Sequence, residues 1–503
     1  MTTAAYPDPS VEDTAVVAGA RPAGAASDIG SRAAANTLLL LAARIASRLI
    51  ALAVVLVIQH RLIDADFGVF NTVVTYTALV STVVDLGFNT LYVREGARHL
   101  DQLERYLDNV ASVKVPLSLV GLLVLSGILH WRGFDDLVLP AFALMIGAAY
   151  SNLLRNTFYA NGRLVWEAIA IVMESCVLLL LAVIGLRTGQ GVAFFLWAYA
   201  VTYAVSCVWF VAVLYATRVA HLRWRLELDA VIRPWFVTGL PLAVTAVLAN
   251  VYWKVDVPIL QASKGNAEVG WYTLAYSPFQ ALLFIPFTLR NVAFPVLGVY
   301  YRSAPDMLRR GAAMLFRALL ILGLPCTVGL LVLTPQITQL LHFRYPQAEA
   351  SLRILAIAIV FMFVDNTFIT AINAMDRQKI YMFIALTGLV VNVGLDLSLI
   401  PRWGYLGASW ATVITEVVLV CVGWSVLARL GVRLDVPRIS WRVLLAGAGM
   451  GAVLLLFHNA SGWTTVAAIL TGTVAYAVAL LAVRAVTDEE RALVLRVLPG
   501  ARR

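Results

Sequence analysis

Four cationic side chains interrupt stretches that are otherwise apolar and long enough to cross a lipid bilayer. Arg44 and Arg48 are one helical turn apart and would share a helix face, while Lys114 and Arg290 lie in two other stretches. A charge at the centre of a bilayer costs about 2.5–3.5 kcal/mol on insertion scales, so each cation needs a physical reason. Arginine binds phosphate oxygens through two parallel donors. The four residues are therefore a candidate site for a diphosphate that crosses the membrane.

A structural explanation stays open for the same cations. Arg44 or Arg48 could pair with Glu174 or Asp85, and the stem of Lys114 could reach the membrane interface. Such pairs would stabilise helix packing and leave no cation for a ligand.

Acidic side chains form a second group within the apolar stretches. Asn392 and Asp396 are one turn apart on one helix face, and Thr412 follows on the next expected helix. Carboxylate, amide and hydroxyl oxygens suit a hard cation such as Na+. The candidate cation site comprises Asp256, Asn392, Asp396 and Thr412. The alternative is a polar clamp between helices, with Asp256 paired to Lys254.

Two further acids, Asp365 and Glu416, belong to no motif. Either could be a protonated packing residue or a proton carrier, because burial without a partner favours the neutral carboxyl. The sequence does not decide between these roles.

The elements that position these residues are expected to be membrane-spanning helices, each of about 20 apolar residues. The sequence predicts an all-α polytopic membrane protein with about fourteen transmembrane helices. The prolines in the eighth span, Pro278 and Pro286, are expected to bend it. The expected spans are 33–58, 69–91, 109–129, 137–157, 166–186, 192–216, 234–256, 272–294, 312–334, 351–373, 380–400, 404–428, 439–457 and 463–486.

Composition supports a membrane protein. Hydrophobic residues make up 61% of the 503 positions, charged residues make up 13%, and the mean hydropathy is +0.83. A soluble chain is about half apolar and about a quarter charged. The net charge of +9 comes from Lys and Arg in short loops, so no nucleic-acid partner is expected. The four cysteines and six histidines show no metal-ligand spacing, so no metal other than Na+ is expected.

Charge distribution predicts the orientation of the chain. Lys and Arg concentrate in alternate loops, among them Arg94, Arg98 and Arg105, and the positive-inside rule then places both termini in the cytoplasm. No loop is long enough to fold as a domain, so any chemistry would occur within the membrane. The expected organisation is a disordered cytoplasmic tail at 1–32, a first lobe at 33–218, a second lobe at 219–433, and two last helices with a cytoplasmic tail at 434–503.

Two pairs of similar segments indicate that the lobes arose by duplication. The acidic turn and glycine of 64–70 return at 266–272, and 160–163 is matched by 374–377. Both pairs occur in the same order and at a similar offset. Duplicated membrane halves are common in transporters.

Several motifs carry a resemblance to a known family over roughly residues 33 to 430. They are Asp66-Phe-Gly-Val-Phe70, Asp85-Leu-Gly-Phe88, and Asn392-x-x-x-Asp396 followed by Ile400-Pro401 and Gly404-x-x-Gly407-Ala408. This part of the chain resembles polysaccharide flippases, the Wzx-like members of the multidrug/oligosaccharidyl-lipid/polysaccharide (MOP) exporter superfamily.

The resemblance implies two six-helix lobes related by a pseudo-twofold axis, plus two C-terminal helices, around a cavity that opens alternately to either side. It implies as cargo a polyprenyl-diphosphate-linked oligosaccharide, moved from the inner to the outer leaflet of a bacterial or archaeal cytoplasmic membrane. The partners would be this lipid-linked oligosaccharide, membrane lipids, and a glycan polymerase or other export machinery.

The resemblance also bears on the coupling ion. Some lipid II flippases of the superfamily hold sodium with an Asp on span seven, an Asn-x-x-x-Asp pair on span eleven and a Thr on span twelve. Asp256, Asn392, Asp396 and Thr412 match that pattern. Na+ or H+ is thus the implied coupling ion, and no other cofactor is expected.

Three other functions stay open. A lipid II flippase would have the same hydropathy. A MATE-type drug/cation antiporter would favour an acidic, aromatic cavity over a cationic one. A membrane glycan ligase or polymerase would need a sizeable outer loop with catalytic groups, which this sequence lacks. We therefore expect a transporter and not an enzyme.

Overall fold

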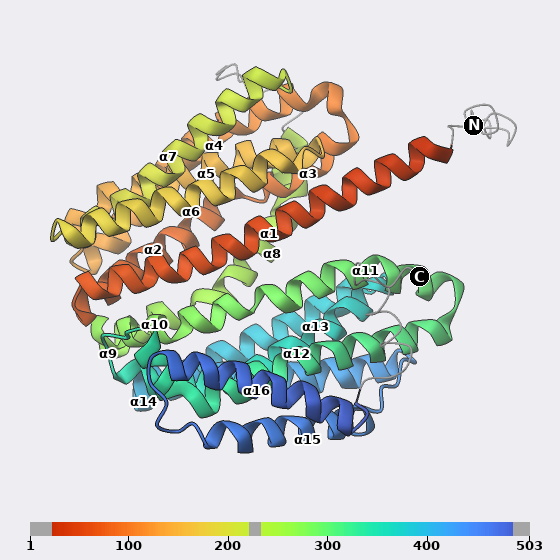
Figure 1. The fold of residues 1–503 in the computed structure, drawn as a ribbon. Helices are drawn as coiled ribbons and strands as arrows, with labels where there is room; N and C mark the ends of the chain where they lie inside the picture. The colour runs from red at the N-terminus through yellow and green to blue at the C-terminus, as the bar shows by residue number, and fades with distance from the viewer. Residues whose placement is uncertain (1–22, 221–232, 486–503) are drawn as a thin grey trace, which may run out of the picture.

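The computed structural model describes residues 23–220 and 233–485 of the chain (Figure 1). Both ranges are helical, and neither contains a β-strand. The α-helices are α1 (Ala23–Arg61), α2 (Asp64–Asp85), α3 (Phe88–Arg98), α4 (Leu103–Trp131), α5 (Val138–Ala160), α6 (Leu164–Arg187), α7 (Val192–Thr217), α8 (Arg233–Lys254), α9 (Asp256–Lys264), α10 (Asn266–Leu282), α11 (Phe284–Ser303), α12 (Pro305–Leu340), α13 (Gln347–Ala374), α14 (Gln378–Arg429), α15 (Val436–Leu455) and α16 (Trp463–Ala482).

The all-α membrane fold predicted from the sequence is confirmed. Within the described ranges, 13 helical segments are long and apolar enough to cross a membrane. One of them, α14, consists of two helices that meet at Gly404, whose backbone is non-helical (φ 58°, ψ −136°). Each half of α14 is long enough to span a bilayer, which accounts for the difference from the expected fourteen spans.

Two more spans are interrupted just before a proline. Proline has no N–H to donate to the carbonyl four residues earlier, which is Lys254 for Pro258 and Leu282 for Pro286. Accordingly α8 ends at Lys254 and α10 ends at Leu282. The bend expected in the eighth span is present, and the break before Pro258 places Asp256 at the start of α9.

The second span differs from its expected range of 69–91. Helix α2 begins in the acidic turn at Asp64 and ends at Asp85, because Leu86 and Gly87 both have left-handed backbone (φ 45° and 73°). Glycine adopts this conformation without strain and commonly ends helices. Residues 88–91 therefore belong to a separate short helix, α3.

The expected boundaries of the lobes stay predictions, as does their pseudo-twofold relation. The start of the expected disordered tail, 1–22, and the expected C-terminal tail beyond residue 485 lie outside the described ranges. Residues 23–32, assigned to the tail from the sequence, are the first part of α1.

The helices pack into two bundles (Figure 1). Helices α1 to α7 form the N-terminal bundle, and α10 to α16 form the C-terminal bundle. Helix α8 lies between them. Its first half packs on the N-terminal bundle, where Trp235 contacts Tyr106 and Phe236 contacts Phe88, with ring centroids 5.2 and 5.1 Å apart. Its second half lines a cavity in the C-terminal bundle.

The repeated segments 64–70 and 266–272 contact each other where the bundles meet. A Cβ added to Gly68 would lie 1.7 Å from the carbonyl oxygen of Asn266, and one added to Gly270 would lie 2.4 Å from that of Asp64. Trp271 also donates from Nε1 to Asp64 Oδ2 at 3.2 Å. Small residues let membrane helices approach closely. The two glycines of the repeat are therefore required by reciprocal backbone contact between α2 and α10, at what we call the Asp64 end of the molecule.

A second contact joins the bundles at the same end. The carbonyls in the last turn of a helix lack intrahelical partners. Those of α1 accept from the α12–α13 loop: His60 from Arg344 Nη1 at 2.7 Å, and Leu62 from the Tyr345 hydroxyl at 2.7 Å. Gln59 Oε1 accepts from the Arg344 backbone N–H at 2.9 Å. We call this set the α1 latch.

Replacement of Gly68 by valine is expected to destabilise the protein by about 1–3 kcal/mol, because the new side chain would overlap the Asn266 carbonyl and push α2 away from α10. The measurement is the apparent Tm of the purified protein in detergent. The matched control is Gly127→Val on α4, where an added Cβ meets no atom within 4 Å. Equal Tm values for the two variants would contradict the proposed close contact.

Candidate functional site

Lys114 is held by Asp85 inside the N-terminal bundle. Its Nζ lies 2.5 Å from Asp85 Oδ1, and its side chain is only 1% exposed. Asp85 is available because α2 ends there at the Leu86–Gly87 turn. From the sequence, Asp85 could have paired with Arg44 or Arg48. In the structure its partner is Lys114.

A second ion pair, which is partly buried, joins α5 and α6. Arg155 Nη2 donates to both carboxylate oxygens of Glu174, at 2.6 and 2.7 Å. Ser206 and Ser151 also donate to Glu174 Oε1. Arg155 lies near the end of the expected span 137–157, but α5 continues to Ala160, so this side chain is only 19% exposed. The polar residues on both sides of Arg155 hid its place inside the helix from an analysis of hydropathy.

Arg44 and Arg48 differ in their surroundings. Arg44 donates to the Tyr159 hydroxyl and lies 3.4 Å from Glu167 Oε1, yet its side chain is 49% exposed. Arg48 is exposed, and no hydrogen bond or ion pair to it is found in the described part of the chain. Both stand on α1, which packs along α6 and also contacts α10 of the other bundle. Their role in binding a diphosphate stays a prediction.

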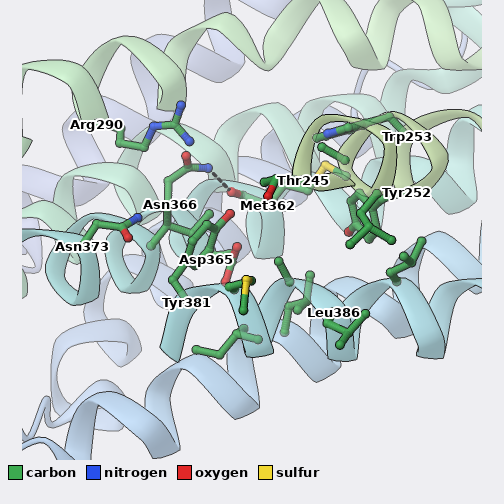
Figure 2. A pocket seen from close by; sticks show the side chains of 18 of the residues that line it. Thr245, Tyr252, Trp253, Arg290, Met362, Asp365, Asn366, Asn373, Tyr381 and Leu386 are labelled. Carbon is green, nitrogen blue, oxygen red and sulfur yellow. Dashed lines mark hydrogen bonds between the residues drawn. The ribbon is translucent and has the colours of Figure 1, made fainter. Parts of the chain in front are cut away.

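Arg290 lines a cavity of about 780 Å³ in the C-terminal bundle, which we call the C-terminal cavity (Figure 2). Side chains of α8, α11, α13 and α14 surround it, with Arg290 and Asn373 toward one end and Tyr252 and Trp253 toward the other. The guanidinium packs 5.0 Å from the ring centroid of Phe287. Across residues 23–220 and 233–485 it has no ion pair or hydrogen bond. Arg290 is therefore a cation available to a ligand.

The same cavity contains the two acids that the sequence left without a role. Asp365 and Glu416 both line it, and Tyr252 donates its hydroxyl proton to Glu416 Oε1 at 2.6 Å. Lys379 lines it as well. The formal charges of two acids and two bases balance, so this is not the acidic cavity that a drug/cation antiporter would favour.

The expected cation site is largely assembled by the fold. Asp256 accepts from the Tyr272 hydroxyl at 2.5 Å through Oδ2 and from the Val257 N–H at 2.8 Å through Oδ1. Tyr272 also neighbours the hydroxyl of Thr412, and Asp396 is near enough to Asp256 for their charges to interact. Asn392 is buried one turn from Asp396 on α14. The tyrosine that links these groups was missed, because it belongs to none of the motifs considered.

Asp396 provides a test of whether this set fits a cation. Its side chain is fully buried, and neither of its carboxylate oxygens has a hydrogen-bond partner among the described residues. A buried carboxylate without a donor is costly unless a proton or a metal ion satisfies it. The oxygen-only chemistry of the set fits Na+ or H+. Lys254 makes no ion pair with Asp256 in the described ranges, so the clamp alternative lacks that contact.

Comparison with known proteins now identifies the chain. The sequence profile of polysaccharide biosynthesis proteins matches residues 33–300, more than half of the chain. The chain belongs to the polysaccharide biosynthesis protein family. The profile of the lipid II flippase MurJ matches residues 272–490 of this family member. An uncharacterised membrane protein of Methanocaldococcus jannaschii is 26% identical over 197 residues, which cover 38% of this chain and 45% of that protein. The match thus spans less than half of that relative's length.

Solved structures show the same fold. The lipid II flippase MurJ in an inward closed conformation superposes with a TM-score of 0.73 at 13% identity, covering 88% of this chain and 98% of that chain. An inward-facing multidrug resistance MATE family transporter gives 0.63 at 16% identity, over 77% and 94%. An outward-facing MATE transporter gives 0.52 at 16% identity, over 78% and 94%. The chain therefore shares its fold with a flippase and with transporters of the multidrug resistance MATE family.

We expect the Lys114–Asp85 pair to stabilise the bundle. Lys114→Met alone would leave Asp85 without its partner, at a cost of up to about 3–5 kcal/mol. The double variant Lys114→Met/Asp85→Asn should recover most of the apparent Tm and retain transport. If the double variant folds but does not transport, Lys114 acts on the cargo.

Proposed function

We propose that this protein flips a polyprenyl-diphosphate-linked oligosaccharide from the inner to the outer leaflet of the membrane by alternating access. The observation that carries the proposal is Arg290: an unpaired guanidinium that lines a cavity within the membrane-spanning part of the chain. Arg290 is half-buried and near Asp365 without a hydrogen bond to it, and a diphosphate would satisfy its donors through charge-assisted hydrogen bonds. The half-exposed Arg44 and the exposed Arg48 are proposed as further cations on the path of the diphosphate, and Lys114 would join them only after leaving Asp85.

The direction of transport follows from the proposed orientation. With both termini in the cytoplasm, as the positive-inside rule predicts, the Asp64 end faces outward. The α2–α10 contact and the α1 latch would then close the outer side, and the cargo would enter from the cytoplasm. Better superposition on inward conformations, with TM-scores of 0.73 and 0.63 against 0.52, supports this interpretation.

Opening toward the outside would require both contacts at the Asp64 end to break. The latch consists of individually modest hydrogen bonds, each worth about 0.5–1.5 kcal/mol net, so rocking of the bundles can break them when cargo binding favours the other state. The polyprenyl tail would stay in the lipid throughout.

A cation gradient would supply direction, since binding alone cannot. We place Na+ or H+ at Asp256, Asn392, Asp396 and Thr412. Helices α9 and α14 meet here, and α10 joins the same set through Tyr272. Occupation of this set would therefore affect the packing of the helix that carries the α2–α10 contact.

Lipid II is a second candidate cargo, because the MurJ profile matches residues 272–490 and lipid II also carries a diphosphate on a polyprenyl chain. Competition by lipid II against a glycan-linked polyprenyl diphosphate in the same flipping assay separates the two cargoes.

Arg290→Ala is expected to lower the flipping rate of a fluorescent undecaprenyl-diphosphate-linked sugar in proteoliposomes by about 10–100-fold. The reason is the loss of charge-assisted hydrogen bonds worth about 1.5–3 kcal/mol. Arg290→Lys should retain part of the rate, because it preserves the charge but loses the bidentate geometry. Arg302→Ala serves as the control on the same helix, since Arg302 is exposed and paired with Asp376. Wild-type flipping by Arg290→Ala would refute the proposed anion role.

Asp396→Asn is expected to abolish any stimulation of flipping by a Na+ or H+ gradient while leaving the protein folded, because the amide preserves the shape but not the charge. Rates are compared in Na+ and in K+ buffers, with and without a pH gradient. Asp306→Asn, at an exposed position of α12, is the control. Stimulation that persists in Asp396→Asn would place the coupling ion elsewhere.

A further inference from the structure

The C-terminal cavity has a second chemical character besides the cation at Arg290. Its volume of about 780 Å³ lies within the range of about 300–1,000 Å³ that is typical of small-molecule sites. It extends from Arg290 between α8, α13 and α14 to Tyr252 and Trp253 (Figure 2). The space is larger than a diphosphate bound at one arginine requires.

Two polar side chains in its wall are buried without adequate partners. Asp365 is 8% exposed; no hydrogen bond or ion pair to it is found within the described ranges, and Arg290 is near enough for their charges to interact. Asn366 is 5% exposed; its Nδ2 donates to Met362, but its Oδ1 has no donor among the described residues. Buried polar groups are normally satisfied, because each one left unpaired costs free energy. These two acceptors therefore indicate a ligand that brings hydroxyl or N–H donors.

Aromatic side chains provide the complementary surface. Tyr252, Trp253 and Tyr381 line the cavity, and most of its remaining lining is aliphatic. Tyrosine and tryptophan combine a flat apolar face with a hydrogen-bonding tip. A ligand with apolar C–H faces and a rim of hydroxyl groups would match both the aromatic faces and the acceptors of Asp365 and Asn366. Sugars have this combination.

Arg290 sits where a diphosphate and its first sugar would be joined. It also lines a neighbouring cavity of about 300 Å³, together with Asn291, Thr370 and Asn373. Phosphates at the guanidinium could extend into this smaller cavity, while the attached sugar would extend into the larger one. A bound diphosphate would neutralise Arg290, and the remaining formal charges of the cavity, Asp365 and Glu416 against Lys379, would then disfavour an acidic sugar there.

We propose that the C-terminal cavity binds the sugar attached directly to the diphosphate, and that it accepts neutral or amino sugars and rejects uronic acids. This inference rests on the flippase function proposed above. It assigns the selection of cargo to the C-terminal bundle, with Asp365 as the main acceptor for sugar hydroxyl or amino groups and Tyr381 as a hydroxyl partner. The diphosphate contributes affinity at Arg290 whichever sugar follows it.

The test compares three synthetic probes on the purified full chain in detergent: farnesyl diphosphate, its N-acetylglucosamine conjugate and its glucuronic acid conjugate. Binding is followed by isothermal titration calorimetry. We expect N-acetylglucosamine to tighten binding by at least about tenfold over farnesyl diphosphate, which corresponds to about 1.4 kcal/mol. Glucuronic acid should give no gain.

The variants separate the sugar from the phosphate. Asp365→Ala should remove the gain from N-acetylglucosamine and leave the affinity for farnesyl diphosphate within about twofold, and Tyr381→Phe, which removes only a hydroxyl, should reduce the same gain. Thr367→Ala is the matched control, because Thr367 is a buried polar residue of α13 that does not line the cavity. Arg290→Ala should weaken all three probes alike.

Each result has a distinct meaning. If wild-type protein binds the three probes equally, or if Asp365→Ala and Tyr381→Phe preserve the full gain, the sugar site is refuted while the flippase proposal stands. If wild-type protein binds none of the probes, the proposed diphosphate site fails, and the sugar assignment fails with it.

Discussion

A lipid bilayer offers no hydrogen-bond partner, so a charged side chain inside this protein must be satisfied within the chain or by something that the chain carries. Most of the N-terminal bundle follows the first route. Lys114 is paired with Asp85, and Arg155 with Glu174. The second route explains the exceptions. Arg290, Asp365 and Asp396 have no such partner in the described ranges, and all three belong to the C-terminal bundle or the helix that leads into it. These three groups therefore lie in one half of the molecule, while Arg44 and Arg48 of the other half are exposed.

The two halves meet at a repeated motif, and its glycines are explained by distance. Gly68 and Gly270 each face a carbonyl of the other segment so closely that no side chain fits. The acid of the second copy has a further role, because Glu268 Oε2 accepts from the Tyr405 N–H at 2.9 Å, directly after the kink at Gly404. The contact between the bundles and the kink of α14 thus both involve the segment 266–272. A change in one is physically connected to the other, as alternating access requires.

The two bundles differ in how their charges are paired, and this difference suits a flippase with a large cargo. A bundle whose charges are internally paired can move as a rigid unit, since its polar contacts persist in both states. A bundle with unsatisfied groups gains free energy when cargo or ion arrives, and that gain can drive the population shift. Helix α8 connects the two, because its first half packs on α3 and α4 while its second half lines the C-terminal cavity. Cargo bound beside Tyr252 would thus be sensed by a helix anchored in the opposite bundle.

The sequence by itself determined the all-α membrane class and the proline break at Pro286, and it predicted about fourteen spans and a set of candidate ion ligands. These properties depend on local hydropathy, on a missing N–H and on spacing along one helix, all of which can be read from neighbouring residues. Only the tertiary structure decided which charges are paired. Lys114 is as conspicuous in the sequence as Arg290, and Arg155 is not conspicuous at all. The carboxylates that pair with Lys114 and Arg155 lie on other helices. Among the described residues, helix packing brings those carboxylates to bond with Lys114 and Arg155, whereas Asp365 lies near Arg290 without bonding to it. Contact across helices depends on helix rotation and depth, which hydropathy does not encode.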